Sequence, residues 1–222
     1  STLMRSSAAS DVYKRQAAAF LCFGSEANAQ KTIKLFNGKD LSNWNFVVDK
    51  NVVPAEQVYS VEDGIINITG NPFGYMYTKD KYSNYKLHVE YRWPNGKENA
   101  NSGIFLLIAD PKNPFPNGIE CNLMKDNAGD FVLLGGSDLA EYQGKPGEPH
   151  PAFPVVRKTN PDSEKPAGEW NEANVFVKDG VITVYINGVY QNTGTNKQKE
   201  GYIGLQSEGK EVQFRNVTIT PW

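Results

Sequence analysis

The strongest constraint on the fold is the spacing of the apolar residues, which from Ile33 onward recur mostly with a period of two. Tyr85–Trp93 alternates without a break between apolar and polar side chains, which is typical of a half-buried antiparallel strand. Two-residue turns of the hairpin type occur at Asp63-Gly64, Asp179-Gly180 and Asn187-Gly188. These features predict an antiparallel sheet with up-and-down connections, and they disfavour a helical bundle.

Short apolar runs bounded by turn residues predict about a dozen strands, and no stretch has a helical period. We therefore expect an all-β fold, an antiparallel sandwich of two sheets packed face to face. The longest interruption, from Gly135 to Ala167, is of a length that is usually functional or mobile in a compact domain. Besides Tyr85–Trp93, the predicted strands are Gln57–Glu62, Ile65–Thr69, Gly74–Thr78, Ser102–Ala109, Gly118–Met124, Phe131–Leu134, Asn174–Lys178, Val181–Ile186, Val189–Asn192, Gly201–Ser207 and Glu211–Ile219.

Charge and motifs narrow the classes of ligand. The chain has 23 Lys and Arg against 25 Asp and Glu, a net charge of -2, so it lacks the basic surface that binding to phosphate backbones requires. We expect no nucleic-acid partner. The glycine motifs of nucleotide-binding proteins and the nucleophile elbow of serine hydrolases are absent from the sequence. Because there are only two histidines, a His-rich zinc site would need both of them and carboxylates as well.

The first thirty residues differ from the rest. Residues 1–16 are similar to translated adaptor or vector sequence, and we interpret them as a non-native leader. Residues 17–29 resemble the end of a signal peptide, since a short apolar run precedes Ala27-Asn28-Ala29, a small-x-small cleavage site. The run is too short to span a membrane. A disordered tail and a lipoprotein anchor at Cys22 are the alternatives. We expect a periplasmic or secreted protein with one domain, residues 30–222, and a single thiol at Cys121.

Polar side chains form rows when the predicted strands are assigned a period of two. Glu120 and Asn122 share one face of their strand, opposite Ile119, Cys121 and Leu123. If the rows belong to one sheet, its outer face carries groups suited to a polyhydroxylated ligand; the alternative is the ordinary solvated face of a sandwich. The other two rows are Glu211, Gln213 and Arg215, with slippage near Asn216, and His88, Glu90 and Arg92.

Eight short motifs follow one another along Lys31–Trp222. They are Leu35–Trp44 (LFNGKDLSNW), the Asp63-Gly64 hairpin, Asn101–Phe105 (NSGIF), Gly118–Glu120 (GIE), Pro166–Asn171 (PAGEWN), Val184–Gly188 (VYING), Gly204–Gln206 (GLQ) and Phe214–Asn216 (FRN). In this order they resemble the 3-keto-disaccharide hydrolase domain family, which is common in Bacteroidota. The resemblance implies a concanavalin A-like jelly roll. It also implies cleavage of glycosides whose sugar is oxidised to a ketone at C3, by C2 deprotonation, elimination and hydration.

The resemblance also implies roles for single residues. Glu120 is the first choice for the general base or a carboxylate that contacts the ligand. Arg92 and Arg215 are candidates for binding the enolate oxygen or the sugar hydroxyls, although Arg215 could equally form a structural ion pair. His150 is a candidate acid or base, with a solvated loop histidine as the alternative. Asn101 and Gln206 are assigned to substrate binding.

The chain departs from the family pattern at two places. After Gln206 the family usually has a histidine and a glycine, whereas this chain has Ser207-Glu208-Gly209. Glu208 replaces the histidine with a carboxylate and is a candidate for substrate binding. After Glu120 it has Asn122, a candidate for substrate binding, where the family often has Gln and Asp. The loss of the histidine leaves a non-catalytic carbohydrate-binding domain as the alternative to an enzyme. The sequence requires no cofactor, and a divalent cation held by Glu120, Glu208 and His150 stays open.

Overall fold

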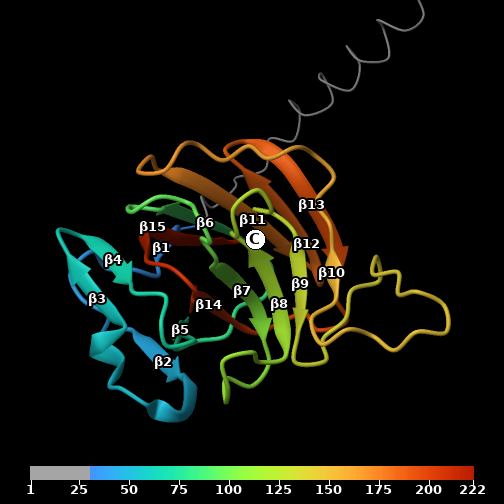
Figure 1. Ribbon diagram of the computed structural model, residues 1–222, viewed down its shortest axis with the longest axis horizontal. Helices are drawn as coiled ribbons and strands as arrows, with labels where there is room; N and C mark the ends of the chain where they lie inside the picture. Colours follow the sequence, from blue (N-terminus) through green and yellow to red (C-terminus); the bar gives the residue numbers. More distant parts are fainter. Residues whose placement is uncertain (1–30) are drawn as a thin grey trace, which may run out of the picture. The chain divides into compact units, whose positions relative to one another are not determined.

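The computed structural model describes Lys31–Trp222. The leader and signal-peptide predictions, and with them the predicted periplasmic or secreted location, fall on residues 1–30 and lie outside the described part. Within that part no helix is long and apolar enough to cross a membrane. The chain forms two short 3-10 helices, Asp49–Asn51 (η1) and Ala55–Gln57 (η2), and the strands β1 Ile33–Lys34, β2 Trp44–Val48, β3 Tyr59–Glu62, β4 Ile65–Ile68, β5 Gly74–Thr78, β6 Tyr85–Arg92, β7 Gly103–Ile108, β8 Gly118–Asn122, β9 Phe131–Leu134, β10 Val155–Val156, β11 Asn171–Lys178, β12 Val181–Ile186, β13 Val189–Thr195, β14 Tyr202–Ser207 and β15 Val212–Pro221 (Figure 1).

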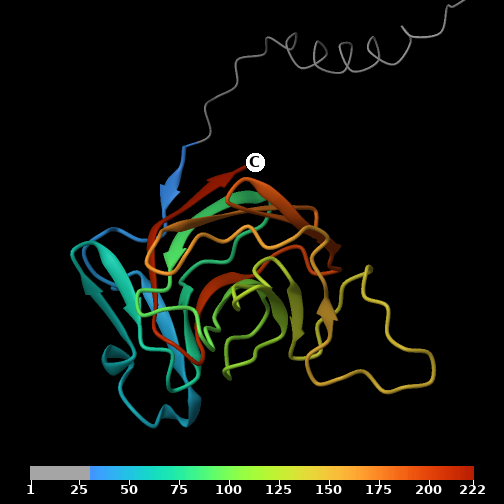
Figure 2. The ribbon, with the colours of Figure 1, turned by 45° about the horizontal axis from the view of Figure 1, so that its top comes forward.

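The strands form two antiparallel sheets, which appear as two layers in Figure 2. Sheet A has the order β13-β12-β11-β6-β15-β4-β3, with β1 also paired to β15, and sheet B has the order β10-β9-β8-β7-β14-β5-β2. The predicted two-sheet sandwich is confirmed. The up-and-down connection is wrong, because β6 lies between β11 and β15, and β14 lies between β7 and β5, so that chain neighbours are repeatedly separated.

The hydrophobic core fills the space between the sheets, and the period of two explains which residues enter it. On β6, Tyr85, Leu87, Val89 and Tyr91 are buried, while the residues between them face outward. The three predicted hairpins connect β3 to β4, β11 to β12 and β12 to β13. Both residues of each turn have positive φ, which is why Asp-Gly and Asn-Gly stand there.

Sheet B is unusual because its outer face, the one turned away from sheet A, is also partly apolar. This face carries a second buried cluster of Tyr75, Phe105, Ile108 and Leu134, with Val47, Tyr77, Phe115, Val132 and Tyr202 packed against it. The continuous apolar run Gly103–Ile108 reflects burial on both faces of the strand. An outer face that is this apolar and yet carries carboxylates is the place to look for a binding site.

Candidate functional site on the outer face of sheet B

Glu120 lies in the middle of β8 and points to the outer face of sheet B. Its neighbours in the chain, Ile119 and Cys121, belong to the core between the sheets, as the period of two predicts. Across the sheet Glu120 is opposite Phe105 on β7 and Val132 on β9. The strand therefore holds a carboxyl group rigidly on a largely apolar surface.

A cavity of about 230 Å³ opens beside Glu120. Its polar lining comes from Asn101, Glu120, Asn122 and Glu208, four of the residues that sequence analysis selected. Gln206 reaches the same group through Glu208, as described below. The remaining lining residues are apolar: Phe115, Met124, Val132, Leu134, Phe153 and Val155.

The side chain of Glu120 is only 4% exposed and has neither a hydrogen bond nor an ion pair within Lys31–Trp222. Space for it is provided by Gly103 on β7, where a Cβ atom would lie 2.5 Å from the Glu120 Cγ and Oε1 atoms. Burial raises the pKa of the Glu120 carboxyl well above its ordinary value of 4.5, and the negative charge of Glu208 raises it further. The environment therefore favours a protonated Glu120.

Glu208 follows β14 and bridges to Asn101, and its carboxylate accepts a hydrogen bond of 2.5 Å from the Gln206 amide. Burial raises the pKa of Glu208 above its usual 4.5, while the hydrogen bond from Gln206 opposes that rise. Within Lys31–Trp222, Glu120 has no donor of this kind. Of the two carboxyl groups, Glu208 is therefore better suited to carry the negative charge, and Glu120 the proton.

Polar atoms without a partner converge on this face. Within the described residues, the Asn101 Oδ1, Gln206 Oε1 and Tyr75 hydroxyl oxygen atoms are buried and lack a hydrogen bond. Tyr75 on β5 is directly opposite Gln206 on β14. Because buried polar groups in folded proteins are almost always paired, such a cluster indicates a place where a ligand or solvent supplies the missing partners.

Asn122 has its side-chain oxygen occupied, since that oxygen accepts a hydrogen bond of 2.7 Å from the Met124 backbone N–H. The amide group of Asn122 makes no hydrogen bond to the described residues, and the side chain lines the cavity. It is therefore placed to donate to a ligand oxygen.

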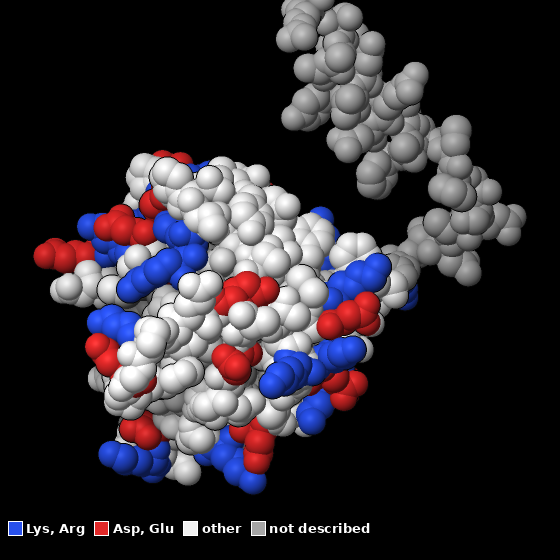
Figure 3. Space-filling model, turned by 90° about the vertical axis from the view of Figure 1, so that its right-hand side faces the viewer, with Lys and Arg blue, Asp and Glu red and all other residues white. Residues whose placement is uncertain are grey.

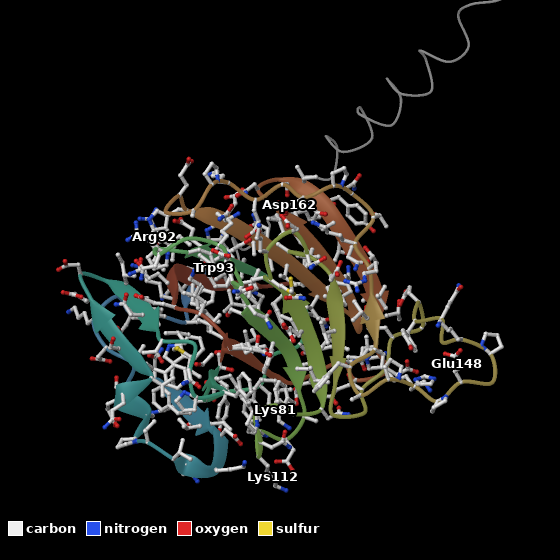
Figure 4. The ribbon with its side chains drawn as sticks, viewed as in Figure 1. Lys81, Arg92, Trp93, Lys112, Glu148 and Asp162 are labelled. Atoms are coloured by element: carbon white, nitrogen blue, oxygen red, sulfur yellow. The ribbon has the colours of Figure 1, made fainter. Side chains whose placement is uncertain are left out.

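The structure does not bring Arg92 and Arg215 to this cavity, so the condition that all three polar rows belong to one sheet is not met. The two arginines stand on β6 and β15, which are neighbours in sheet A, on its outer face (Figure 4 labels Arg92). Both guanidinium groups lie over the ring of Trp170, at 4.6 Å for Arg92 and 4.0 Å for Arg215. The sequence shows that a residue faces outward, but it does not show from which sheet.

The contacts around Trp170 are those of a structural cluster. Arg215 donates to the Glu90 carboxylate at 2.6 Å, which is the ion-pair alternative raised from the sequence, and Arg92 donates to the Gln213 side chain at 2.6 Å. A cavity of about 330 Å³ lies beside Trp170, but the amide of Asn187 there is bound within the protein. No unpaired buried side-chain atom within Lys31–Trp222 lines this cavity.

His150 lies in the loop between β9 and β10, and its ring packs against Tyr142 with a centroid distance of 5.1 Å. It is exposed and is not among the residues that line the Glu120 cavity. Figure 4 shows Glu148 of the same loop projecting away from the sandwich. Within residues 31–222 no three His, Cys, Asp or Glu side chains are grouped to hold a metal ion, so the set of Glu120, Glu208 and His150 is not assembled.

Several residues of this face were missed by sequence analysis. Phe115 and Phe153 line the cavity from loops, where no periodicity reveals their direction, and Phe73 reaches Phe115 from the turn before β5. Tyr75 lies in a strand that was predicted correctly, but nothing in the sequence marks its hydroxyl as unpaired.

The side of the molecule shown in Figure 3 carries Lys and Arg interspersed with Asp and Glu among uncharged groups, without a cluster of one sign.

Comparison with known proteins adds the family. Residues 31–220 match the family of the 3-keto-alpha-glucoside-1,2-lyase-like domain. The chain belongs to this family. A 3-keto-disaccharide hydrolase of Bacteroides thetaiotaomicron is 25% identical in an alignment of 245 positions that covers 86% of this chain and 79% of that protein. The family resemblance found in the sequence motifs is thus confirmed.

Solved structures support the fold of this family member. A candidate glycosyl hydrolase of Parabacteroides distasonis has a TM-score of 0.61 at 23% identity, covering 86% of this chain and 100% of that one. A β-glucanase of Bacillus licheniformis has a TM-score of 0.55 at 12% identity, covering 89% and 100%. At these identities the likeness shows the concanavalin A-like sandwich alone.

Proposed function

We propose that this family member is a glycoside-cleaving enzyme that acts on 3-keto-glycosides, with Glu120 and Glu208 as its acid and base. The observation that carries the proposal is the buried Glu120 carboxyl, which has no partner within the described residues, beside Glu208 in a cavity whose lining includes the unpaired Asn101 Oδ1 atom. Perturbed carboxyl groups in a cavity are characteristic of acid–base catalysis. The family and the name of the Bacteroides relative support the choice of substrate.

The first step follows from the acidity of the substrate. A ketone at C3 stabilises the carbanion at C2 as an enolate, so the C2–H bond breaks heterolytically and Glu208 accepts the proton. The enolate carries the negative charge on the C3 oxygen. Neutral donors suit this site, and the Asn122 amide group is one that is free to hydrogen bond with a developing oxyanion.

In the second step the enolate electron pair re-forms the ketone and a C1=C2 double bond, and the C1–O bond breaks with its electrons on the leaving oxygen. Glu120 gives its proton to that oxygen, which requires a carboxyl group that is protonated near neutral pH. Water then adds across the double bond, with its oxygen on C1 and a proton on C2. The sum is hydrolysis, and both carboxyl groups return to their initial state.

This assignment makes Glu120 the acid, whereas the sequence favoured it as the base. The change rests on the hydrogen bond that Gln206 gives to Glu208 and on the absence of any donor to Glu120 within the described residues. Asn101, Asn122 and Gln206 are then left to bind the oxidised sugar. A carbonyl or hydroxyl group of that sugar would also supply partners for the buried Asn101 and Gln206 oxygen atoms.

The test is release of the leaving group from chemically prepared 3-keto-glucosides by the wild-type protein, Glu120→Gln and Glu208→Gln. We expect Glu208→Gln to lower kcat/KM by roughly 10²–10⁴-fold on all substrates. Glu120→Gln should do so for alkyl leaving groups but much less for nitrophenyl, which departs without a proton. Glu172→Gln on β11 of sheet A is the matched control, and it should be unchanged.

Three outcomes would contradict parts of the proposal. Wild-type rates in Glu208→Gln would remove the base, and an equal loss for alkyl and nitrophenyl substrates in Glu120→Gln would remove the assignment of the acid. If the wild-type protein binds 3-keto-glucosides in calorimetry but cleaves none of them, the non-catalytic carbohydrate-binding alternative is correct.

A further inference from the structure

Three phenylalanines form a row across the outer face of sheet B. Phe73 precedes β5, Phe115 lies in the loop between β7 and β8, and Phe153 lies in the loop between β9 and β10. The ring centroids are 5.9 Å apart for Phe73 and Phe115, and 5.1 Å apart for Phe115 and Phe153. Segments that are distant in the chain thus meet in one continuous aromatic surface, which we call the phenylalanine row.

The phenylalanine row is anchored at its middle and open at its ends. Phe115 packs against the buried cluster on the outer face of sheet B, whereas Phe73 is 42% and Phe153 46% exposed. Single exposed apolar residues are common, but a contiguous group that adjoins a polar cavity is typical of a binding surface. Phe115 and Phe153 both line the cavity that contains Glu120.

The size of the cavity decides what the row can bind. Pockets that enclose drug-sized ligands measure roughly 300–1,000 Å³, whereas this cavity measures about 230 Å³. A substrate with two rings therefore does not fit inside it. With the oxidised sugar at the carboxyl groups, the second ring has to lie at the opening of the cavity, where Phe115 and Phe153 form part of the lining.

We propose that the phenylalanine row binds the leaving group of the substrate by stacking against the apolar face of its ring. The inference rests on the proposed function, because it needs an oxidised sugar at Glu120 and Glu208. Phenyl side chains offer no hydrogen-bonding group, so the row selects a ring by its face and is indifferent to its pattern of hydroxyl groups. Both an aryl group and the C–H face of a second sugar have this chemistry.

The experiment compares three kinds of 3-keto-glucoside, each as both anomers. The methyl glucoside has no ring in the leaving group, the phenyl glucoside has an aryl ring, and a disaccharide has a sugar ring. Steady-state kcat/KM is measured for wild-type protein, Phe73→Ala, Phe153→Ala and Phe153→Tyr. Phe176→Ala on β11 of sheet A is the matched control, because Phe176 is a half-buried phenylalanine that packs against Trp222 and Tyr185 far from this cavity.

We expect each alanine variant to lose roughly 10-fold in kcat/KM on the phenyl substrate, through a raised KM, which corresponds to one lost aromatic contact. The methyl substrate should be unaffected, and Phe153→Tyr should retain wild-type behaviour because the ring is kept. A loss on the phenyl substrate alone would identify an aryl leaving group as the preferred occupant. An equal loss on the disaccharide would extend the site to sugar rings.

Two results would overturn the inference, and they are distinguishable from each other. If wild-type protein cleaves the substrates and the alanine variants behave like Phe176→Ala, or lose equally on the methyl glucoside, the row does not bind the leaving group and the proposed function stands. If wild-type protein cleaves none of the three kinds of substrate, the proposed function fails and the inference fails with it.

Discussion

The fit of Glu120 against Gly103 gives a prediction about stability that needs no substrate. A Cβ atom at position 103 would have as its three nearest neighbours the Glu120 Cγ, Oε1 and Cδ atoms, at 2.5, 2.5 and 2.7 Å. Real Cβ atoms do not approach other heavy atoms so closely, so Gly103→Ala forces the Glu120 side chain to move. The φ angle of Gly103 is not in the left-handed region, so alanine meets no backbone strain there.

Two opposing effects set the magnitude. Overpacking of a well-filled site costs about 1–3 kcal/mol, whereas replacing a strand glycine by alanine gains about 0.5–1 kcal/mol from chain entropy. Gly103→Ala should therefore destabilise the wild-type protein by roughly 0.5–2 kcal/mol. With Glu120→Ala as the background the obstacle is gone, and the same substitution should be stabilising or neutral.

Urea-induced unfolding, followed by tryptophan fluorescence at one pH, measures both legs of this double-mutant cycle. We expect a coupling free energy of about 1–3 kcal/mol between positions 103 and 120. A third background, Glu120→Gln, keeps the shape and removes the titratable carboxyl group, so the penalty of Gly103→Ala should persist there if the conflict is steric. Equal penalties in the Glu120 and Glu120→Ala backgrounds would show that Gly103 does not make room for Glu120.

Three further predictions concern Glu120, Trp170 and Glu164. Because folding raises the pKa of Glu120 above 4.5, the folded state holds an extra proton at pH values between 4.5 and the folded pKa. The contribution of Glu120 to the unfolding free energy should therefore fall as pH rises through that window, by up to about 1.4 kcal/mol per pH unit. Glu120→Gln should reduce the pH dependence of the urea midpoint there, with the remainder coming from Glu208 and Glu164, and an unchanged slope would contradict the raised pKa of Glu120. Trp170→Ala removes the ring shared by Arg92 and Arg215 and should lower the free energy of unfolding by about 1–2 kcal/mol without changing kcat/KM. If activity is lost while the protein stays folded, Trp170 and the two arginines belong to the active site. The Glu164 side chain is buried and accepts hydrogen bonds from the Tyr91 hydroxyl at 2.8 Å and the Trp93 indole at 3.3 Å, with the Lys97 ammonium 3.3 Å away. Glu164→Ala should therefore lower the free energy of unfolding by about 3 kcal/mol in the same assay. A loss below about 1 kcal/mol would show that solvent replaces Glu164 as the partner of Lys97.

Much of the fold could be predicted from the sequence because a half-buried strand leaves its mark in every second residue. The bounds of Gly74–Thr78, Phe131–Leu134 and Val181–Ile186 agree with β5, β9 and β12. The expected slippage near Asn216 is a bulge, where the pairing of β15 with β6 shifts register and Asn216 has a positive φ of 51°. Alternation and turn chemistry are local, so they allow a strand to be recognised without knowledge of its partner strand.

The elements that were missed have no such local signal. The strands β1 and β10 have two residues each, too few to show alternation, and β10 is defined only by its pairing with β9. β2 begins at Trp44, directly after a turn, and is not among the predicted strands. Tertiary pairing, rather than intrinsic preference, makes these segments into strands.

The residues of the candidate site also divide into those that a local pattern predicts and those that it does not. The sequence placed Glu120 and Asn122 together because they belong to one strand, and it placed Asn101, Gln206 and Glu208 with them only through the family motifs. It could not separate Arg92 and Arg215 from this group, because the assignment of a strand to sheet A or sheet B is a property of the whole topology. A row of polar residues shows that one side of a strand faces outward, but a sandwich has two outer faces, one on each sheet.

The two outer faces also differ in how their polar groups are satisfied, and this difference separates a site from a scaffold. Around Trp170 the Arg215 guanidinium is paired with Glu90 and the Arg92 guanidinium donates to the Gln213 side chain, so both arginines contribute to stability. Around Glu120 an unpaired carboxyl and unpaired amide oxygens are kept in an apolar setting, an arrangement that costs stability in the free protein. Violations of this kind in an otherwise consistent fold are expected where function requires them. For this reason we place the proposed chemistry at the unpaired groups on sheet B rather than at the larger cavity on sheet A.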